Sequence, residues 1–475
     1  MRSLKRIVFL TALVAIGATS TSVFAQQRPA APATPAAAGP VRKLALVGGM
    51  LLDGYEVPPV HHAAVLIEGN KIVKVGRAAD ITIPPDYTVI DTSGRTMLPG
   101  LMDLHAHLML LGHGNYAQWF PWLAKNGVDR VMEISAKQFI NAGVTTAVDL
   151  SAPLEPSLNV RDRINRGEIV GPRMLMSGPW ITLSQGNYPP DLKFQYVVKT
   201  PEEAAAQVEA LAKAGVDVIK AYPMTKAHYA AVAAAAHKHN LKVHAHVYAE
   251  TMVRDALEAG IDVLTHAGSA GTSPPYSAAM IRDIVNTGRP VVVTAAHRSW
   301  VYPDTIAFPE RLQDPQLKKD FPKDIWDEVQ RSFANWHTLP YFQRTDREMF
   351  FRERGIKQFI ESGAVMGMGT DSGTPMNFNT EALWREIKVH VDMGMSPLRA
   401  ISAATRVNAR IIGRADELGT IEPGKLADII VVKGDPLFNI TALAHVEVVV
   451  KDGVVLKDER PAAARPAVPV SRSNR

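Results

Sequence analysis

Two histidines one residue apart, His105 and His107, close the short apolar segment 101–107. Side chains of a β-strand alternate between its two faces, so both imidazoles point to the same side if this segment is a strand. Two imidazoles on one face can bind a single metal ion together. An isolated His-x-His pair is a weak signal, because such pairs also occur as surface or core histidines. Its place at the end of an apolar segment strengthens the interpretation as a metal site.

A lysine also stands at the end of an apolar segment. Lys220 closes the segment 216–220 and shares its parity with Val216 and Val218, so we expect it to point inward. An unpaired buried ammonium is costly, and Lys220 therefore needs an anionic partner, a depressed pKa or a covalent modification. Carboxylation by CO₂ would make it an anionic oxygen ligand able to bridge two metal ions. Its spacing in the sequence leaves these three readings open.

Three further segments end in residues that can bind metal: His246 in VHAHV, His266 after 263–265 and Asp371 after VMGMGT. His244 has the parity of His246 but lies farther from the end of its segment, and we interpret it as a residue behind the ligands or in the core. The chain has no cysteine, so a metal must bind nitrogen and oxygen. Such a set suits Zn²⁺, Mn²⁺, Co²⁺ or Fe²⁺.

The elements that must position these residues alternate between strands and helices. Candidate strands are 101–107, 144–150, 173–177, 216–221, 243–247, 263–266, 291–295 and 365–371, and helical patterns lie between them. Eight such units predict an α/β fold, a (β/α)₈ TIM barrel over residues 100–414, with functional groups at the carboxyl ends of the strands. An open doubly wound sheet is the alternative, but no Gly-rich dinucleotide fingerprint follows the first strand.

One connection of the predicted barrel, an insertion at about 296–345, is much longer than the others and rich in aromatic residues. Long loops at the carboxyl face of a barrel commonly serve as lids or walls of the active site. A pair of extra helices on the outside is an equally good interpretation.

Short strands and turns fill both ends of the chain outside the barrel. Gly69 and Asn70 separate two apolar runs and predict a hairpin, and the segments 428–432 and 446–451 repeat this pattern. Each part alone is too short for a complete sandwich. We therefore predict one small β-sandwich domain formed from residues 41–99 and 415–460.

The first 25 residues are typical of a secretory signal peptide. Arg2, Lys5 and Arg6 precede the apolar run 7–16, which is too short to span a bilayer, and a cleavage site is expected near Ala25. The sequence thus predicts a periplasmic or secreted protein without a membrane anchor after cleavage. Residues 26–40 are read as a Pro/Ala linker and 461–475 as a disordered tail.

The charge balance excludes a broad nucleic-acid-binding surface. The chain has 52 basic and 47 acidic residues, a net charge of +5. Seven of the basic residues lie in 1–40 and 461–475, which contain no acidic residue, so the rest of the chain has 45 basic residues against 47 acidic ones. The basic excess therefore belongs to the ends of the chain, and no nucleic-acid partner is expected.

The motifs as a set resemble the amidohydrolase superfamily, especially its imidazolonepropionase-like and Xaa-Pro or Xaa-Arg dipeptidase branch. The resemblance covers about residues 41–460. It is carried by MLPGLMDLHAHL (97–108), VDVIKAY (216–222), KVHAHVYAE (242–250), DVLTHAG (262–268), GMGTDSG (367–373) and GTIEPGKLADIIVVKGDP (419–436).

The resemblance implies two divalent metal ions. Zinc is the favoured metal, and Mn, Co or Fe are also compatible. His105, His107 and Asp371 would bind the more buried ion, His246 and His266 the more exposed one, and carboxylated Lys220 and a hydroxide would bridge them. The hydroxide would attack the scissile carbonyl, with Asp371 as general acid and base. The implied function is hydrolysis of a C–N bond in a small-molecule amide, a peptide or a cyclic amide.

Four residues after the strands could contact the substrate: Trp180, Tyr222, His297 and Arg298. Arg298 could bind a carboxylate by bidentate geometry. An equally good interpretation is that these are loop residues packed at the rim. The insertion departs from the shorter dipeptidases and suggests a bulkier amide than a simple dipeptide.

Other activities fit the same residues. An esterase, lactonase or phosphotriesterase could use the same binuclear site. A deaminase is less favoured, because the related mononuclear deaminases lack the lysine of the fourth strand, and a non-catalytic binding protein is disfavoured because every ligand is present. Assembly into a homo-oligomer is expected only by analogy with relatives.

Overall fold

The computed structural model describes residues 41–186, 189–269, 274–343 and 345–461. The predicted signal peptide, the linker and residues 462–475 of the predicted tail lie outside the described residues. Within the described part of the chain, no helix combines the length and apolar character needed to cross a membrane.

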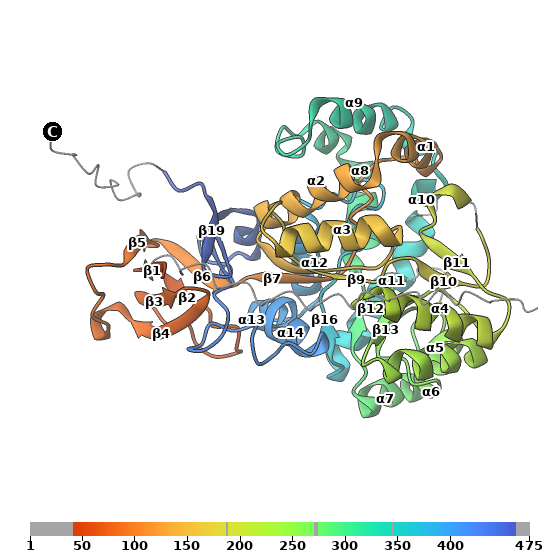
Figure 1. Cartoon of the computed structure of the whole chain (residues 1–475), viewed down its shortest axis with the longest axis horizontal. Coiled ribbons are helices and arrows are strands. Elements are labelled where there is room, and N and C mark those ends of the chain that lie inside the picture. Colours follow the sequence, from red (N-terminus) through yellow and green to blue (C-terminus); the bar gives the residue numbers. More distant parts are fainter. Residues whose placement is uncertain (1–40, 187–188, 270–273, 344, 462–475) are drawn as a thin grey trace, which may run out of the picture. The chain divides into compact units, whose positions relative to one another are not determined.

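Parallel strands form two sheets in the larger part of the molecule (Figure 1). A three-stranded sheet has the order β7 (Leu101–Ala106), β8 (Val144–Asp149), β9 (Arg173–Met176). The order of the seven-stranded sheet is β11 (Gln195–Val197), β10 (Trp180–Thr182), β12 (Val218–Ala221), β13 (Lys242–His246), β14 (Val263–Thr265), β15 (Val291–Val292), β16 (Met366–Gly367).

Backbone hydrogen bonds connect the two parallel sheets at two places. Asp217 N, next to β12, donates to Met176 O of β9 at 2.9 Å, and Leu104 N of β7 donates to Met368 O at 3.0 Å. Ala106 forms a further parallel bridge with Ser372. The eight predicted strand positions are therefore linked in sequence, and the last lies beside the first.

The last two strands are shorter than the sequence pattern predicts. β15 stops before Thr294, whose φ is 53°, and β16 stops before Asp371, whose φ is 57°. Both values lie in the left-handed region, so neither residue continues the extended backbone of its strand. The predicted segments 291–295 and 365–371 thus end as irregular chain at the carboxyl face.

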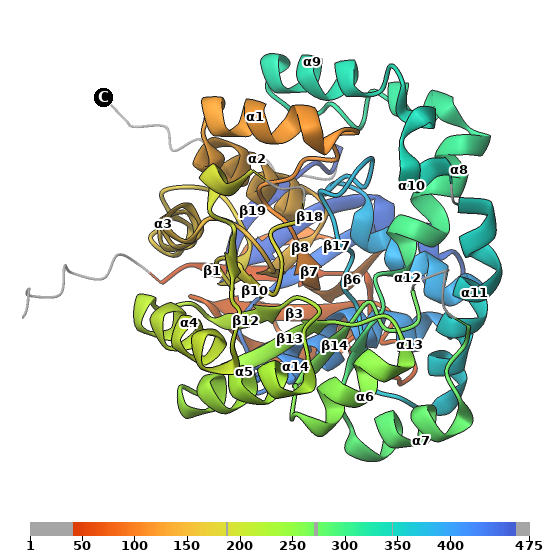
Figure 2. The same ribbon diagram turned by 90° about the vertical axis from the view of Figure 1, so that its right-hand side faces the viewer.

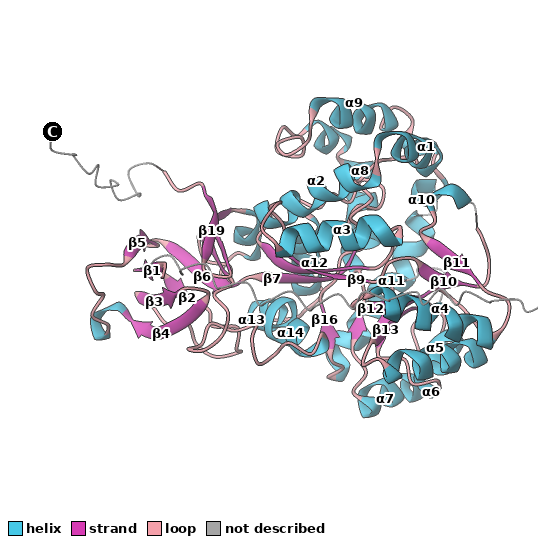
Figure 3. Cartoon of the chain, in the orientation of Figure 1, coloured by secondary structure: helices cyan, strands magenta, loops and turns pink. Residues whose placement is uncertain are grey.

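Helices surround the parallel strands on the outside (Figures 2 and 3). Those that follow successive strands are α2 (Val128–Asn141), α3 (Leu154–Asn165), α4 (Pro201–Ala214), α5 (Lys226–Lys238), α6 (Glu250–Glu258), α7 (Ala278–Thr287), α12 (Ala382–Asp392), α13 (Pro397–Ser402) and α14 (Asn408–Ile411). Local sequence sets their ends, as α4 illustrates. The hydroxyl of Thr200 accepts from Glu203 N at its start, and Gly215 takes φ 89° at its end. Its buried face contains Ala204, Val208 and Leu211.

The long connection between β15 and β16 is mostly helical. It begins with a π-helical turn, His297–Val301, and continues through α8 (Tyr302–Ala307), α9 (Lys323–Ser332), α10 (Pro340–Gln343) and α11 (Thr345–Ser362). Helix α9 lies beside α1 (Tyr116–Asn126) in both views (Figures 1 and 2). Residues at the start of the connection, His297, Arg298 and Tyr302, line the central cavity described below.

The remaining strands form two further sheets. One has the order β4 (Lys71–Arg77), β3 (Ala63–Glu68), β1 (Lys43–Val47), β5 (Thr88–Asp91). The other has the order β19 (Val454–Asp458), β18 (Val446–Lys451), β17 (Ile429–Lys433), β6 (Arg95–Pro99), β2 (Met50–Leu51) and so combines strands from both ends of the described chain. Buried side chains of both sheets share one core, among them Leu46, Ile67 and Val431.

A partly buried arginine ties this β region to the parallel strands. Arg173 on β9 donates to Asp428 Oδ2 at 2.7 Å and also pairs with Asp452. The Asp428 side chain is only 3% exposed, and its other oxygen accepts from Asp452 N at 2.8 Å. Removal of the guanidinium would leave a buried carboxylate without its counter-ion.

We expect Arg173→Met to lower the free energy of unfolding by about 3 kcal/mol, because breaking one side of a buried ion pair has that cost. Urea unfolding followed by circular dichroism measures it. Arg130→Met is the matched control: Arg130 pairs with Asp324 on the surface, both side chains being about half exposed, and its loss should cost less than about 1 kcal/mol. Equal losses in the two variants would contradict the structural role of Arg173.

Candidate metal centre

One cavity of about 260 Å³ at the carboxyl ends of the parallel strands contains all ten residues predicted for the site. Six are the predicted metal ligands and four the predicted substrate contacts. In chain order they are His105, His107, Trp180, Lys220, Tyr222, His246, His266, His297, Arg298 and Asp371.

The two histidines of β7 face the carboxylate of Asp371. Nε2 of His107 lies 3.1 Å from Asp371 Oδ1, and Nε2 of His105 lies 3.6 Å from the same oxygen. Both ring nitrogens of His105 are buried and have no hydrogen-bond partner in the described structure. Buried polar atoms are rarely left unpaired. A metal ion, which accepts the lone pair of an imidazole nitrogen, would therefore fit beside this ring.

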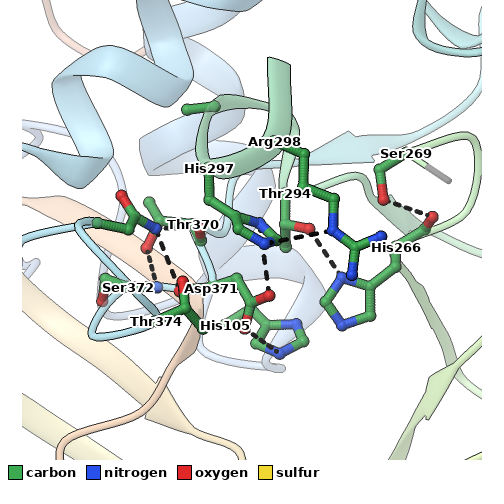
Figure 4. A network of polar contacts seen from close by, with 12 residues as sticks. His105, His266, Ser269, Thr294, His297, Arg298, Thr370, Asp371, Ser372 and Thr374 are labelled. Carbon is green, nitrogen blue, oxygen red and sulfur yellow. Dashed lines mark hydrogen bonds and ion pairs between the residues drawn. The ribbon is translucent and has the colours of Figure 1, made fainter. Parts of the chain in front are cut away.

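The imidazoles of His246 and His266 complete a cluster of rings, and Figure 4 shows His266 near His105 and Asp371. The ring centroids of His246 and His266 lie 4.3 Å apart, and those of His105 and His266 lie 4.5 Å apart. Nδ1 of His266 is hydrogen-bonded to Thr294 Oγ1 at 2.8 Å, which fixes the orientation of its ring. Ligand atoms of His105, His266 and Asp371 all lie within 4.8 Å of one another.

Burial keeps these imidazoles in the form that binds metal. It lowers the pKa of His105, His246 and His266 well below the usual range, and the nearby Lys220 ammonium acts in the same direction. Neutral imidazole offers a free lone pair, whereas imidazolium does not. The donor set is therefore ready for a divalent cation at neutral pH.

Lys220 on β12 is buried in the same cavity. Its Nζ donates to Thr265 Oγ1 at 3.0 Å, and the Thr265 hydroxyl donates in turn to Ala245 O at 2.7 Å. Burial lowers the pKa of Lys220 to about 7, against the opposite effect of Asp371. A large fraction of this amine is consequently neutral near pH 7 and carries a lone pair.

The carboxylate of Asp371 joins the histidines to the start of the insertion. Its Oδ2 lies 3.5 Å from Nδ1 of His297. Burial alone raises the pKa of the Asp371 carboxyl, but the imidazoles of His297 and His107 outweigh this effect and hold it well below its usual range. Asp371 is therefore ionised and available as an oxygen ligand.

Left-handed backbone recurs at the strand ends of this site. The φ angles of His266, Thr294 and Asp371 are 66°, 53° and 57°. Such conformations cost energy in residues other than glycine and tend to occur at functional sites. Gly369 has a related role, because a Cβ there would lie 2.8 Å from His105 N. The Cγ1 atom of Val292 would lie closer still, 2.6 Å from that Cβ, so the glycine lets a neighbouring side chain and the backbone of β7 approach closely.

The predicted substrate contacts form two groups in the cavity. Trp180 stacks on Tyr222 with ring centroids 4.7 Å apart, and Tyr222 lies 4.4 Å from the His246 ring. Arg298 donates to Tyr248 Oη at 2.7 Å and lies over the Tyr248 ring. Tyr248 was not among the predicted residues, although it shares the parity of His246 in KVHAHVYAE.

His244 does not line the cavity. It is paired in register with Lys220, and burial lowers its pKa to about 3. Its Nδ1 has no hydrogen-bond partner in the described structure. These observations agree with its interpretation as a residue behind the ligands or in the core.

Two buried carboxyl groups support the site without lining the cavity. Asp103 accepts from His105 N at 3.0 Å and from Thr370 Oγ1 at 2.6 Å, and burial raises its pKa to about 7. Its parity with His105 in MDLHAH is the signal that could have identified it.

Glu386 on α12 accepts from Ala295 N at 2.9 Å and Ala296 N at 2.7 Å. Only the folded structure brings it to this loop, between Thr294 and His297.

Comparisons with known proteins place the geometry in context. Residues 96–456 match the profile of the amidohydrolase family. Imidazolonepropionase of Geobacillus kaustophilus is 32% identical over 22% of this chain, a match that spans a quarter of that relative. Imidazolonepropionase of Thermoplasma acidophilum is 23% identical over 83% of this chain and 88% of its own length. A crystal structure of a Xaa-Pro dipeptidase with methionine in its active site superposes with a TM-score of 0.68, at 23% identity, over 87% of this chain and all of that chain.

The Glu386 carboxyl yields a pH-dependent prediction. Burial raises its pKa to about 8 from the ordinary value of 4.5. A carboxyl whose pKa is higher in the folded chain binds more protons there, so its contribution to stability falls as the pH rises between the two values. We expect the melting temperature of wild type minus that of Glu386→Gln to decrease from about pH 5 to about pH 8.5.

Thermal unfolding in a series of buffers measures this difference. Glu155→Gln changes an exposed carboxyl of α3 and should give a curve parallel to wild type. A constant difference between wild type and Glu386→Gln would show that Glu386 does not titrate in this range.

Proposed function

Because the chain belongs to the amidohydrolase family, we propose that it is an exported, metal-dependent hydrolase that cleaves a C–N bond in a small amide, peptide or cyclic amide. The observation that carries the proposal is the cavity itself: six side chains of ligating type surround it, and the buried ring nitrogens of His105 have no partner in the described structure. The names of the relatives, imidazolonepropionase and Xaa-Pro dipeptidase, support this class of bond.

The donor set fits two divalent cations. His105, His107 and Asp371 would hold one cation and His246 and His266 the other, with Lys220 as a shared ligand after carboxylation. Imidazole and carboxylate donors without thiolate favour zinc, and Mn, Co and Fe are also compatible. Cations bound here would supply Lewis-acid polarisation of the scissile carbonyl and a lowered pKa of water.

Carboxylation of Lys220 follows from its amine chemistry. The neutral amine lone pair forms a bond from Nζ to the carbon of CO₂, and the amine loses one proton, which leaves an anionic carbamate. The pKa of about 7 makes the neutral amine available. Bound cations would compensate the buried negative charge.

The chain's own residues would handle the proton and the substrate. Asp371 would accept a proton at its carboxylate as water attacks and return it to the leaving nitrogen. His297, 3.5 Å from Asp371 Oδ2, would restrain that carboxylate. Arg298, next to Tyr248, would bind a carboxylate of the substrate.

The architecture and location belong to the same proposal. The linked order of eight parallel strands supports a (β/α)₈ barrel over residues 100–414, and the shared core of the other two sheets supports a β-sandwich of 41–99 and 415–460. The signal-like segment 1–25 supports export to the periplasm or the medium. A homo-oligomer rests on analogy alone.

Metal analysis together with a substrate screen tests the function. We expect about two ions per chain and hydrolysis within a library of dipeptides and N-acyl amino acids. Asp371→Asn should retain much of the metal and lose at least about 100-fold in kcat, because the amide cannot accept the proton. Gln118→Asn, a change at an exposed residue of α1, should leave both unchanged. Near-normal turnover by Asp371→Asn would overturn the assignment.

Lys220→Ala tests the proposed role of carboxylated Lys220 as a shared metal ligand. Loss of a shared anionic ligand should lower metal content and activity, and small carboxylic acids such as acetate or propionate should restore part of both. Mass spectrometry under native conditions would show carboxylation of wild type as an added CO₂. Unchanged metal content in Lys220→Ala would identify the lysine as structural.

A further inference from the structure

A second cavity, of about 420 Å³, adjoins the metal-binding cavity. The two share Tyr116, Trp180 and Tyr222 in their walls. The other residues that line the second cavity come from the start of α1, the segment after β10 and the first residue of β11: Ala117, Thr182, Ser184, Gly186 and Gln195. No residue of this lining is charged. We call this second cavity the side chamber.

The side chains of Gln195 and Thr182 in the side chamber have hydrogen-bond partners within the protein. Gln195 donates to Gln185 O at 2.7 Å and accepts from Trp180 Nε1 at 3.2 Å. The Thr182 hydroxyl donates to Ser184 O at 3.2 Å and accepts from Ser184 N at 3.4 Å. A charged group placed here would find no counter-ion among the lining side chains. The side chamber therefore suits an uncharged group.

Flat aromatic rings line both the side chamber and the metal-binding cavity. Trp180 and Tyr222 stack with an interplanar angle of 23°, and the Tyr222 ring contacts the ring of His246. The bond from Trp180 Nε1 to Gln195 holds the indole in this orientation. Stacked ring faces favour a planar, aromatic group as their neighbour.

The cationic part of the site lies on another side of the metal-binding cavity. Trp180 belongs to β10 and Arg298 follows β15, and β12, β13 and β14 lie between these two strands in the sheet. A substrate that reaches both must extend across the predicted ligands His246 and His266. Its carboxylate would face Arg298, and its opposite end would face the side chamber.

We propose that the side chamber is a specificity subsite for a planar, uncharged acyl group of an N-acyl amino acid. This inference rests on the proposed function, since it places the scissile amide between the two ends of the substrate. It predicts a preference for aryl over small acyl groups, which the metal ligands alone would not produce.

Two sulfonamides test the subsite without turnover. N-(2-naphthylsulfonyl)glycine and N-(methylsulfonyl)glycine share a carboxylate and have no carboxamide to cleave, so calorimetric titration of the zinc-loaded protein gives both dissociation constants. We expect the naphthyl compound to bind wild type at least about tenfold more tightly, from ring burial and stacking.

Ala117→Trp should abolish this preference. Ala117 is an exposed residue of α1 that lines the side chamber and not the metal-binding cavity. An indole there would fill the side chamber, weaken the naphthyl compound by about tenfold and leave the methyl compound within about twofold. Gln118→Trp is the matched control, because Gln118 is exposed on the same helix and lines neither cavity. It should retain the wild-type ratio.

The affinity ratios test the proposed subsite, and hydrolytic activity tests the proposed function. Equal affinities of wild type for the two compounds, or an unchanged ratio in Ala117→Trp, would overturn the subsite. An equal loss of the ratio in Gln118→Trp would also overturn it. A protein without hydrolytic activity that shows the expected ratios would contradict the proposed function and support the subsite, whereas an active protein without them would contradict the subsite alone.

Discussion

The burial of ionisable groups at one end of the parallel strands is the constraint on which the rest of the site depends. Imidazole, ammonium and carboxylate groups lie together out of water, and each needs a partner to offset its lost hydration. Within the chain, Thr294 holds His266, Thr265 holds Lys220 and Asp103 holds the backbone of His105. The two ring nitrogens of His105 have no hydrogen-bond partner among the described residues, and the cations of the proposed function would bind there.

Much of the site follows from strand parity. Residues with the right chemistry at the ends of apolar segments, such as Lys220 and His246, do face one cavity, because period two and a parallel sheet leave few other places for them. Glu386 could not be predicted in this way, because a helix far along the chain brings it to Ala295. The early ends of β15 and β16 were also missed, because apolar Val293 and Met368 continue the sequence pattern past the last residues of the two strands.

The insertion and the short strands β10 and β11 divide the surroundings of the site into two chemically different parts. The turn after β15 contributes Arg298 and His297, whereas β10 and β11 contribute Trp180 and Gln195. Segments outside the ligand-bearing strands thus give the two parts different chemistry, which is where selectivity can be set without a change of fold.

The five-stranded sheet that contains β2, β6 and β17–β19 has a consequence for how the chain acquires its structure. β6 pairs with β17, whose residues are made more than 300 positions later, for example Met97 with Val431. Until the ribosome has released those late strands, one edge of β6 stays unpaired and its share of the core stays exposed. The sheet therefore closes only after the strands of the parallel sheets have been made, and the unpaired edge of β6 is open to aggregation during that interval.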